Sequence, residues 1–212
     1  SSPTCGNWTA GRRNKVDIAA TVALSAGLAW ASGLRLYLVL FLAGLLARLG
    51  ILHLPASLEM LQHPLVMGVA GTLALAEMVA DKIPAFDSLW DGFQTFIRIP
   101  AGAVLAALAL GDTDPAWMVA AGLLGGTITA GTHFAKAGGR LALNTSPEPF
   151  SNWLASLGEE GLVVGGFALL VAYPGVFLAL LVVFLLGAAW LLNRVARGIS
   201  RLFRSRNLDT SR

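Results

Sequence analysis

The chain has 212 residues, of which 56% are hydrophobic and only 13% are charged, and its mean hydropathy is +0.70. A soluble domain usually carries about 25% charged residues, so this composition excludes an ordinary soluble protein and predicts one helical bundle embedded in a membrane. The single cysteine, Cys5, excludes an internal disulfide framework.

The first apolar segment, residues 16–49, follows a polar tail of residues 1–15 that takes no part in the predicted fold. This segment is too long for one straight span, which needs roughly 17–25 residues. Ser32, Gly33 and Arg35 interrupt it. We therefore expect a broken or surface half-helix, followed by a span near residues 33–49.

Five further apolar segments predict five more helical spans. The helix is the expected form because a bilayer offers no partner for unpaired backbone groups. The turns "GDTDP" at 111–115 and "YPG" at 173–175 separate neighbouring spans, and residues 86–98 read as an amphipathic helix that runs into the third span. The predicted fold is thus an all-α bundle over residues 16–192 with a basic tail at 193–212, and its later spans lie at 64–80, 93–110, 115–137, 160–172 and 175–192.

Positive charge gathers near both ends of the chain, whereas Asp112 and Asp114 are the only charges of the loop at 111–115. By the positive-inside rule, this pattern predicts that both termini face the cytoplasm of a bacterial inner membrane. The arginines of the tail alternate with apolar residues, which favours contact with anionic lipid. The basic residues near the N-terminus are Arg12, Arg13 and Lys15. Those of the C-terminal tail are Arg194, Arg197, Arg201, Arg204, Arg206 and Arg212.

Ionisable residues recur at helical spacing inside the apolar chain, with Glu77 and Asp81 on one helix face and His133, Lys136 and Arg140 on another. A charge at the centre of a bilayer costs about 2.5–3.5 kcal/mol, so most of these groups must pair or face water. Four acids and four bases balance, which predicts a polar cavity that opens to the cytoplasm. The candidate lining is Glu77, Asp81, Lys82, Asp87, Asp91, Arg98, His133, Lys136, Arg140, Asn144, Ser146 and Asn152.

A faint internal repeat relates two of these segments. "GTLALAEMVADKIP" from Gly71 aligns with "GTITAGTHFAKAGG" from Gly126, and the alignment sets Asp81 opposite Lys136. Each copy reads as an apolar helix, a charged turn and a returning helix, and six spans make the two hairpins parallel. Binding sites at the interface of such repeats are typical of transporters.

Four motifs together resemble an uncharacterised family of bacterial membrane proteins that is known as a domain of unknown function. The similarity runs from about residue 31 to about residue 192. It implies a helical inner-membrane protein and transfers no activity. The motifs are E-x3-D-K-x-P from Glu77, D-x2-W-D from Asp87, H-x2-K-x3-R from His133 and N-x-S-P-E-P-x-S-N from Asn144.

The charge pattern favours a transporter or channel-like protein, with proton-coupled movement of a small anionic or zwitterionic solute. Two alternatives stay open, namely a protein that binds or flips a lipid or polyprenyl phosphate, and a structural protein locked by salt bridges. A cavity that opens sideways to lipid would favour the first alternative.

The chain has no catalytic or metal-binding motif such as G-x-S-x-G, H-E-x-x-H, a P-loop or a dinucleotide fingerprint. We therefore expect no enzyme, no metal and no cofactor. Membrane lipids are the expected partners and nucleic acid is not. Small residues in "AGLLGG" (121–126) and "GLVVGG" (161–166) suit close helix packing, either inside the bundle or in a homodimer.

Overall fold

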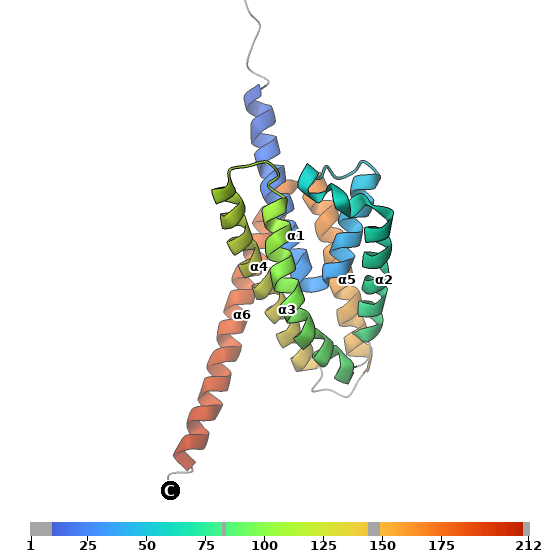
Figure 1. Ribbon diagram of the computed structural model, residues 1–212. Helices are drawn as coiled ribbons and strands as arrows, with labels where there is room; N and C mark the ends of the chain where they lie inside the picture. The colour runs from blue at the N-terminus through green and yellow to red at the C-terminus, as the bar shows by residue number, and fades with distance from the viewer. Residues whose placement is uncertain (1–9, 82–83, 144–148, 210–212) are drawn as a thin grey trace, which may run out of the picture.

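The computed structural model describes residues 10–81, 84–143 and 149–209, with side chains described for 18–81, 90–140, 153–194 and 197. Over these residues the chain is helical and contains no strand, so the predicted all-α class is confirmed. Figure 1 shows the bundle. Its elements are α1 (Ala10–Arg48), the 3-10 helix η1 (Ala56–Gln62), α2 (Pro64–Ala80), α3 (Pro84–Leu108), α4 (Pro115–Leu143), α5 (Pro149–Ala172) and α6 (Pro174–Asp209).

Each of the helices α2 to α6 begins at a proline. Proline suits this position because its ring fixes φ near the helical value and the missing N–H has no partner in the first turn. Two side chains also cap helix starts. His63 Nδ1 accepts a hydrogen bond from the Leu65 N–H at 3.2 Å, and Asp114 Oδ1 accepts one from the Ala116 N–H at 2.8 Å.

Helix α1 is broken at Arg35, whose backbone is extended at φ −148° and ψ 78°. The break confirms the predicted interruption. Both limbs reach the same end of the bundle (Figure 1), because Leu24 of the first limb and Leu52 after the second line one cavity with Pro174. Helix α1 therefore enters the bundle, turns at Arg35 and returns, where the sequence had predicted a broken or surface half-helix followed by one crossing span.

The helices α2 to α6 alternate in direction, so the α2/α3 and α4/α5 hairpins are parallel, as the span count had predicted (Figure 1). The start of α1 and the end of α6 consequently lie at opposite ends of the bundle. This arrangement differs from the predicted placement of both termini on one side, because α1 turns back instead of crossing.

Among the described residues, three helical segments have the length and composition of a membrane span, namely Ile18–Arg48, Trp153–Ala172 and Pro174–Arg194, and the first of them contains the break at Arg35. The bent pair η1 and α2, which meet at 68°, would make a fourth. The sequence had predicted about six spans. Helix α2 alone is only 17 residues long, and α3 and α4 carry polar residues and glycines that lower their hydropathy.

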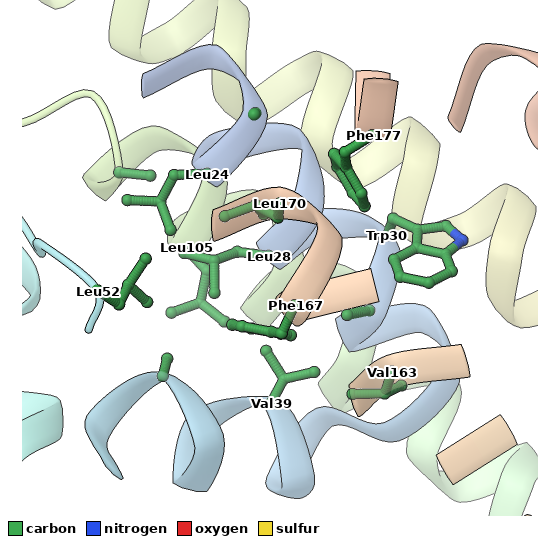
Figure 2. Packing of buried hydrophobic residues seen from close by; sticks show 14 of the residues in the cluster. Leu24, Leu28, Trp30, Val39, Leu52, Leu105, Val163, Phe167, Leu170 and Phe177 are labelled. Atoms are coloured by element: carbon green, nitrogen blue, oxygen red, sulfur yellow. The ribbon is translucent and has the colours of Figure 1, made fainter. Parts of the chain in front are cut away.

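The apolar core surrounds the two limbs of α1. Figure 2 shows Phe167 of α5 among Leu28 and Val39, from the first and second limbs, and Leu105 of α3. Trp30 makes an edge-on contact with Phe177, with ring centroids 5.9 Å apart. This packing fixes how far α1 extends into the bundle, and hence where its break at Arg35 lies.

Glycines bring the break in α1 against α4. A Cβ on Gly33 would lie 2.6 Å from the carbonyl oxygen of Thr129, and one on Gly102 of α3 would lie 2.1 Å from Thr129 Oγ1. The Thr129 hydroxyl also donates to the Ala29 carbonyl at 2.8 Å. Helices α1, α3 and α4 thus meet at backbone distance beside Arg35.

Candidate functional site

Arg35 is 1% exposed and lies where α1 breaks. Its Nη2 lies 2.8 Å from Asp81 Oδ2 of α2 and donates at 2.7 Å to Ser156 Oγ of α5. Its Nε lies 3.3 Å from Glu159 Oε2, and Nη2 lies 3.5 Å from Glu160 Oε1. One guanidinium therefore joins α1 to α2 and α5.

Asp81 is fully buried at the end of α2, and three cations share its Oδ2. Arg35 lies at 2.8 Å, Arg140 Nη2 at 3.3 Å and Lys136 Nζ at 3.6 Å. Glu159 of α5 meets the same three cations, and its shortest contact is 2.9 Å, from Arg140 Nε to Oε1. Two carboxylates thus bind three basic side chains, so no single ion pair can be isolated here.

A second group of charges lies around Arg98 of α3, which is fully buried. Arg98 pairs closely with Glu77 of α2, and its Nη1 lies 3.1 Å from Asp91 Oδ1. The same Nη1 lies 3.3 Å from His133 Nδ1 of α4. Arginine can only donate, so Nδ1 of His133 must accept and the ring proton must reside on Nε2.

The remaining contacts of His133 agree with this tautomer. His133 Nε2 lies 2.7 Å from Thr95 Oγ1, and the Thr95 hydroxyl donates to the Asp91 carbonyl at 2.9 Å. Because the threonine proton is already engaged, its oxygen is an acceptor for Nε2–H. His133 is therefore a neutral imidazole that connects Arg98 to Thr95.

Lys136 joins the two groups into one network. Its Nζ lies 3.6 Å from both Asp81 and Asp91 and 3.3 Å from Glu159, and it donates at 3.2 Å to the carbonyl of Leu34, directly before the break. Among the described side chains the network joins four cations to four buried carboxylates, and the partly exposed Glu160 adds a fifth carboxylate at its edge. Its members are Arg35, Arg98, Lys136 and Arg140, with Glu77, Asp81, Asp91 and Glu159.

The family model for the domain of unknown function DUF4126 matches residues 22–194, a range that contains the whole network. The chain belongs to the DUF4126 family. No curated protein and no solved structure matches it. This match agrees with the expectation from the sequence, where four motifs resemble an uncharacterised family of helical membrane proteins.

The DUF4126 bundle brings seven of the twelve sequence-predicted site residues into this network or its contact shell. These are Glu77, Asp81, Asp91, Arg98, His133, Lys136 and Arg140. The other five are not placed: Lys82, Asn144 and Ser146 lie outside the described residues, and Asp87 and Asn152 lie in α3 and α5 where side chains are not described.

Arg35, Ser156, Glu159 and Glu160 were missing from the predicted set. Sequence reasoning treated Arg35 only as an interruption of an apolar segment, although a charge inside such a segment is by itself a sign of function. Glu159 and Glu160 stand at the start of the predicted span 160–172, because the Pro-rich polar stretch 144–152 before them reads as a loop in the sequence. The structure starts α5 at Pro149, which sets both glutamates two to three turns inside the helix.

The network is also less open than predicted. Instead of a polar cavity, the charges bind one another, and the adjacent cavity of about 530 Å³ has a mostly apolar lining from α4, α5 and α6. Among the described residues, its charged lining consists of Lys136, Arg140 and Glu159. Within the part of the chain that the structure describes, no three His, Cys, Asp or Glu side chains converge as a metal site.

Proposed function

We propose that this protein is a transporter of a bacterial cytoplasmic membrane that moves a small anionic or zwitterionic solute together with protons. The solute site is formed by Arg35, Asp81, Lys136 and Glu159. The observation that carries the proposal is the break of α1 at Arg35, inside the bundle and in contact with charges from α2, α4 and α5.

Broken helices are a recurring device of transporters, because helix ends inside a membrane present backbone groups and charges to a solute. Non-helical backbone at membrane depth is tolerated where it is covered by protein or lines a cavity. Here Lys136 Nζ satisfies the Leu34 carbonyl that precedes the break. The same ammonium contacts Asp81 and Glu159, so the break and the ion pairs form one unit.

The number of charges also favours transport over a purely structural role of the salt bridges. Replacing a buried ion pair by apolar residues is often neutral or stabilising, so four cations and four carboxylates exceed what a stable bundle requires. Asp81 and Lys136 occupy equivalent positions of the sequence repeat and lie 3.6 Å apart. The site therefore lies where the two parallel hairpins meet, as in repeat-built transporters.

The geometry suggests how solute and proton are coupled. A solute carboxylate that binds the Arg35 fork and Lys136 displaces Asp81 or Glu159 from these cations. Among the described cations, the displaced carboxylate would then keep only Arg140 as a partner, and the loss of two cations from a buried site favours its uptake of a proton. One solute charge and one proton thus enter together, and the network stays neutral.

Orientation follows from the charges at the two ends of the bundle. Arg194 and Arg197 lie in the C-terminal half of α6, and the loop with Asp112 and Asp114 lies at the other end of the bundle, as does the start of α1. The start of α1 carries three basic residues, Arg12, Arg13 and Lys15, whereas six arginines follow from residue 194 onward. By the positive-inside rule, the larger number of arginines favours the C-terminal end of α6 in the cytoplasm and the start of α1 on the outer side.

The test is a flux assay in sealed liposomes that contain the full chain and an internal pH-sensitive dye. Glutamate, succinate, glycine and inorganic phosphate are added separately as probes. We expect at least one of them to acidify the interior of protein-containing vesicles and not of empty ones. Asp112→Asn, an exposed change outside the network, should leave the flux intact. A wild-type protein that gives no solute-dependent flux with any probe would contradict the proposal.

A further inference from the structure

A continuous groove runs between α5 and α6. Its larger part is the cavity of about 530 Å³ beside Lys136 and Arg140, and its smaller part is a cavity of about 280 Å³ beside Trp30. The two parts share Leu162 and Phe184 in their linings, so they adjoin. We call the two together the α5/α6 groove.

The walls of the α5/α6 groove are mostly apolar, and glycines leave parts of them without side chains. The smaller part has no charged lining residue. A Cβ built on Gly158, Gly161, Gly165 or Gly187 meets no atom within 4 Å. These glycines therefore front open space along both helices, whereas Gly166 packs against Trp30.

The position of the groove in the membrane follows from its ends. Helices α5 and α6 both have the length and composition of spans. Exposed Trp153 and Trp190 lie beside the charged end of the groove, and exposed tryptophan is typical of the boundary between hydrocarbon and water. Arg194 stacks on Trp190 at 5.2 Å, one turn further on.

The end of the groove beside Trp190 and Arg194 thus lies at the membrane surface, and the rest extends into the hydrocarbon. From Phe177 to Leu191, both of which line the groove, α6 rises by about 21 Å. This length exceeds one leaflet, which is about half of the 30 Å hydrocarbon core.

We propose that the α5/α6 groove binds one acyl chain of an anionic phospholipid taken from the leaflet at the C-terminal end of α6. The chain lies on the bare glycine faces, and the phosphate meets Arg194. Two features select this occupant. The lining of the groove is mostly apolar at hydrocarbon depth, and Arg194 is held over the exposed Trp190 at the end of α6 that faces the membrane surface. The groove shares Lys136 and Glu159 with the wall of the proposed solute site, but lipid binding at Arg194 does not depend on transport.

Native mass spectrometry of the full chain in detergent tests the site. Phosphatidylglycerol and phosphatidylcholine are added in equal amounts, and retained adducts are counted. Gly158→Leu and Gly187→Leu fill the groove without a clash, and Gly68→Leu places the same side chain in open space on α2. We expect phosphatidylglycerol to be retained by the wild type and by Gly68→Leu. The groove variants should retain about tenfold less, the effect of displacing two methylenes of a buried chain.

Thermal unfolding of each variant shows whether it still folds, and the wild-type comparison stands without any variant. Equal retention in wild type and groove variants would overturn the proposal, because the lipid would then bind elsewhere. Equal retention of the two lipids by the wild type would overturn the anionic head-group contact. A dimer that the groove variants disrupt, with no lipid retained, would assign the groove to a second copy of the chain. Loss of the lipid with intact flux would leave the transport proposal standing.

Discussion

Lys136 Nζ donates a hydrogen bond at 3.2 Å to the carbonyl oxygen of Leu34, the last residue before α1 breaks. The same nitrogen contacts Asp81, Asp91 and Glu159. A single side chain of α4 thus supports the interrupted backbone of α1 and joins the two groups of ion pairs.

Lys136→Met should destabilise the protein by about 3–5 kcal/mol, because it leaves buried carboxylates and a backbone carbonyl without their donor. Urea unfolding in detergent measures the effect. Arg48→Met, which removes an exposed cation from the end of α1, should change the free energy of unfolding by less than about 0.5 kcal/mol. Equal effects of the two substitutions would show that Lys136 is not integrated as described.

The Glu77 and Arg98 pair suits a double-mutant cycle, because Glu77 has no other ion pair among the described side chains. Arg98→Met should cost about 3–5 kcal/mol, because it leaves Glu77 as an uncompensated buried charge. Glu77→Leu should cost less, because Arg98 keeps its contact with Asp91. The double variant should cost less than the sum of the two single ones, because Glu77 is then no longer left without its partner. Additive losses would contradict the pairing.

Gly33 allows α1 to approach α4, and Gly33→Ala should therefore destabilise the bundle by about 1–3 kcal/mol. The added Cβ would lie 2.6 Å from the Thr129 carbonyl oxygen, a backbone atom that cannot move alone. Gly131→Ala is the matched control on α4, since its Cβ meets nothing within 4 Å, and it should stabilise by about 0.5–1 kcal/mol. Melting temperatures of the two variants that fall together would count against the close approach.

The contacts of His133 predict a neutral ring that carries its proton on Nε2, because Arg98 occupies Nδ1 as a donor. Nitrogen-15 NMR of labelled histidine distinguishes the two tautomers. A background of His53→Gln and His63→Gln leaves a single signal. A proton on Nδ1 would show that the contact with Arg98 is absent.

The sequence predicted the class, the helices and much of the network, since helical spacing and the energetic cost of buried charge are both local signals. It placed Glu77 and Asp81 on one face and predicted that four acids and four bases balance. It did not predict that α1 turns back, because an apolar segment that crosses a membrane and one that turns back within it have the same composition and hydropathy. The contacts of Arg35 depend on that turn. The turn is defined by tertiary contacts, namely the packing of Gly33 against Thr129 and the hydrogen bond from Lys136 to the backbone before the break.

The composition of the network shows the same limit. Four acids and four bases were expected, and the described side chains give four bases with four buried acids and, at the edge, Glu160. However, Arg35 and Glu159 are members, whereas Lys82 and Asp87 fall where side chains are not described. An unpaired buried charge is energetically costly, so the sequence predicts that buried acids and bases occur in similar numbers. Which residues pair with one another is decided by the fold.

The most direct test of the account is solute-driven proton flux through Arg35→Lys in the liposome assay. Lysine keeps the positive charge beside Asp81, so the protein should still fold, but it lacks the planar fork that would bind a solute carboxylate. We predict a folded variant whose flux is about tenfold or more below that of the wild type, the loss of one charge-assisted hydrogen bond. A folded Arg35→Lys protein with wild-type flux would contradict the account.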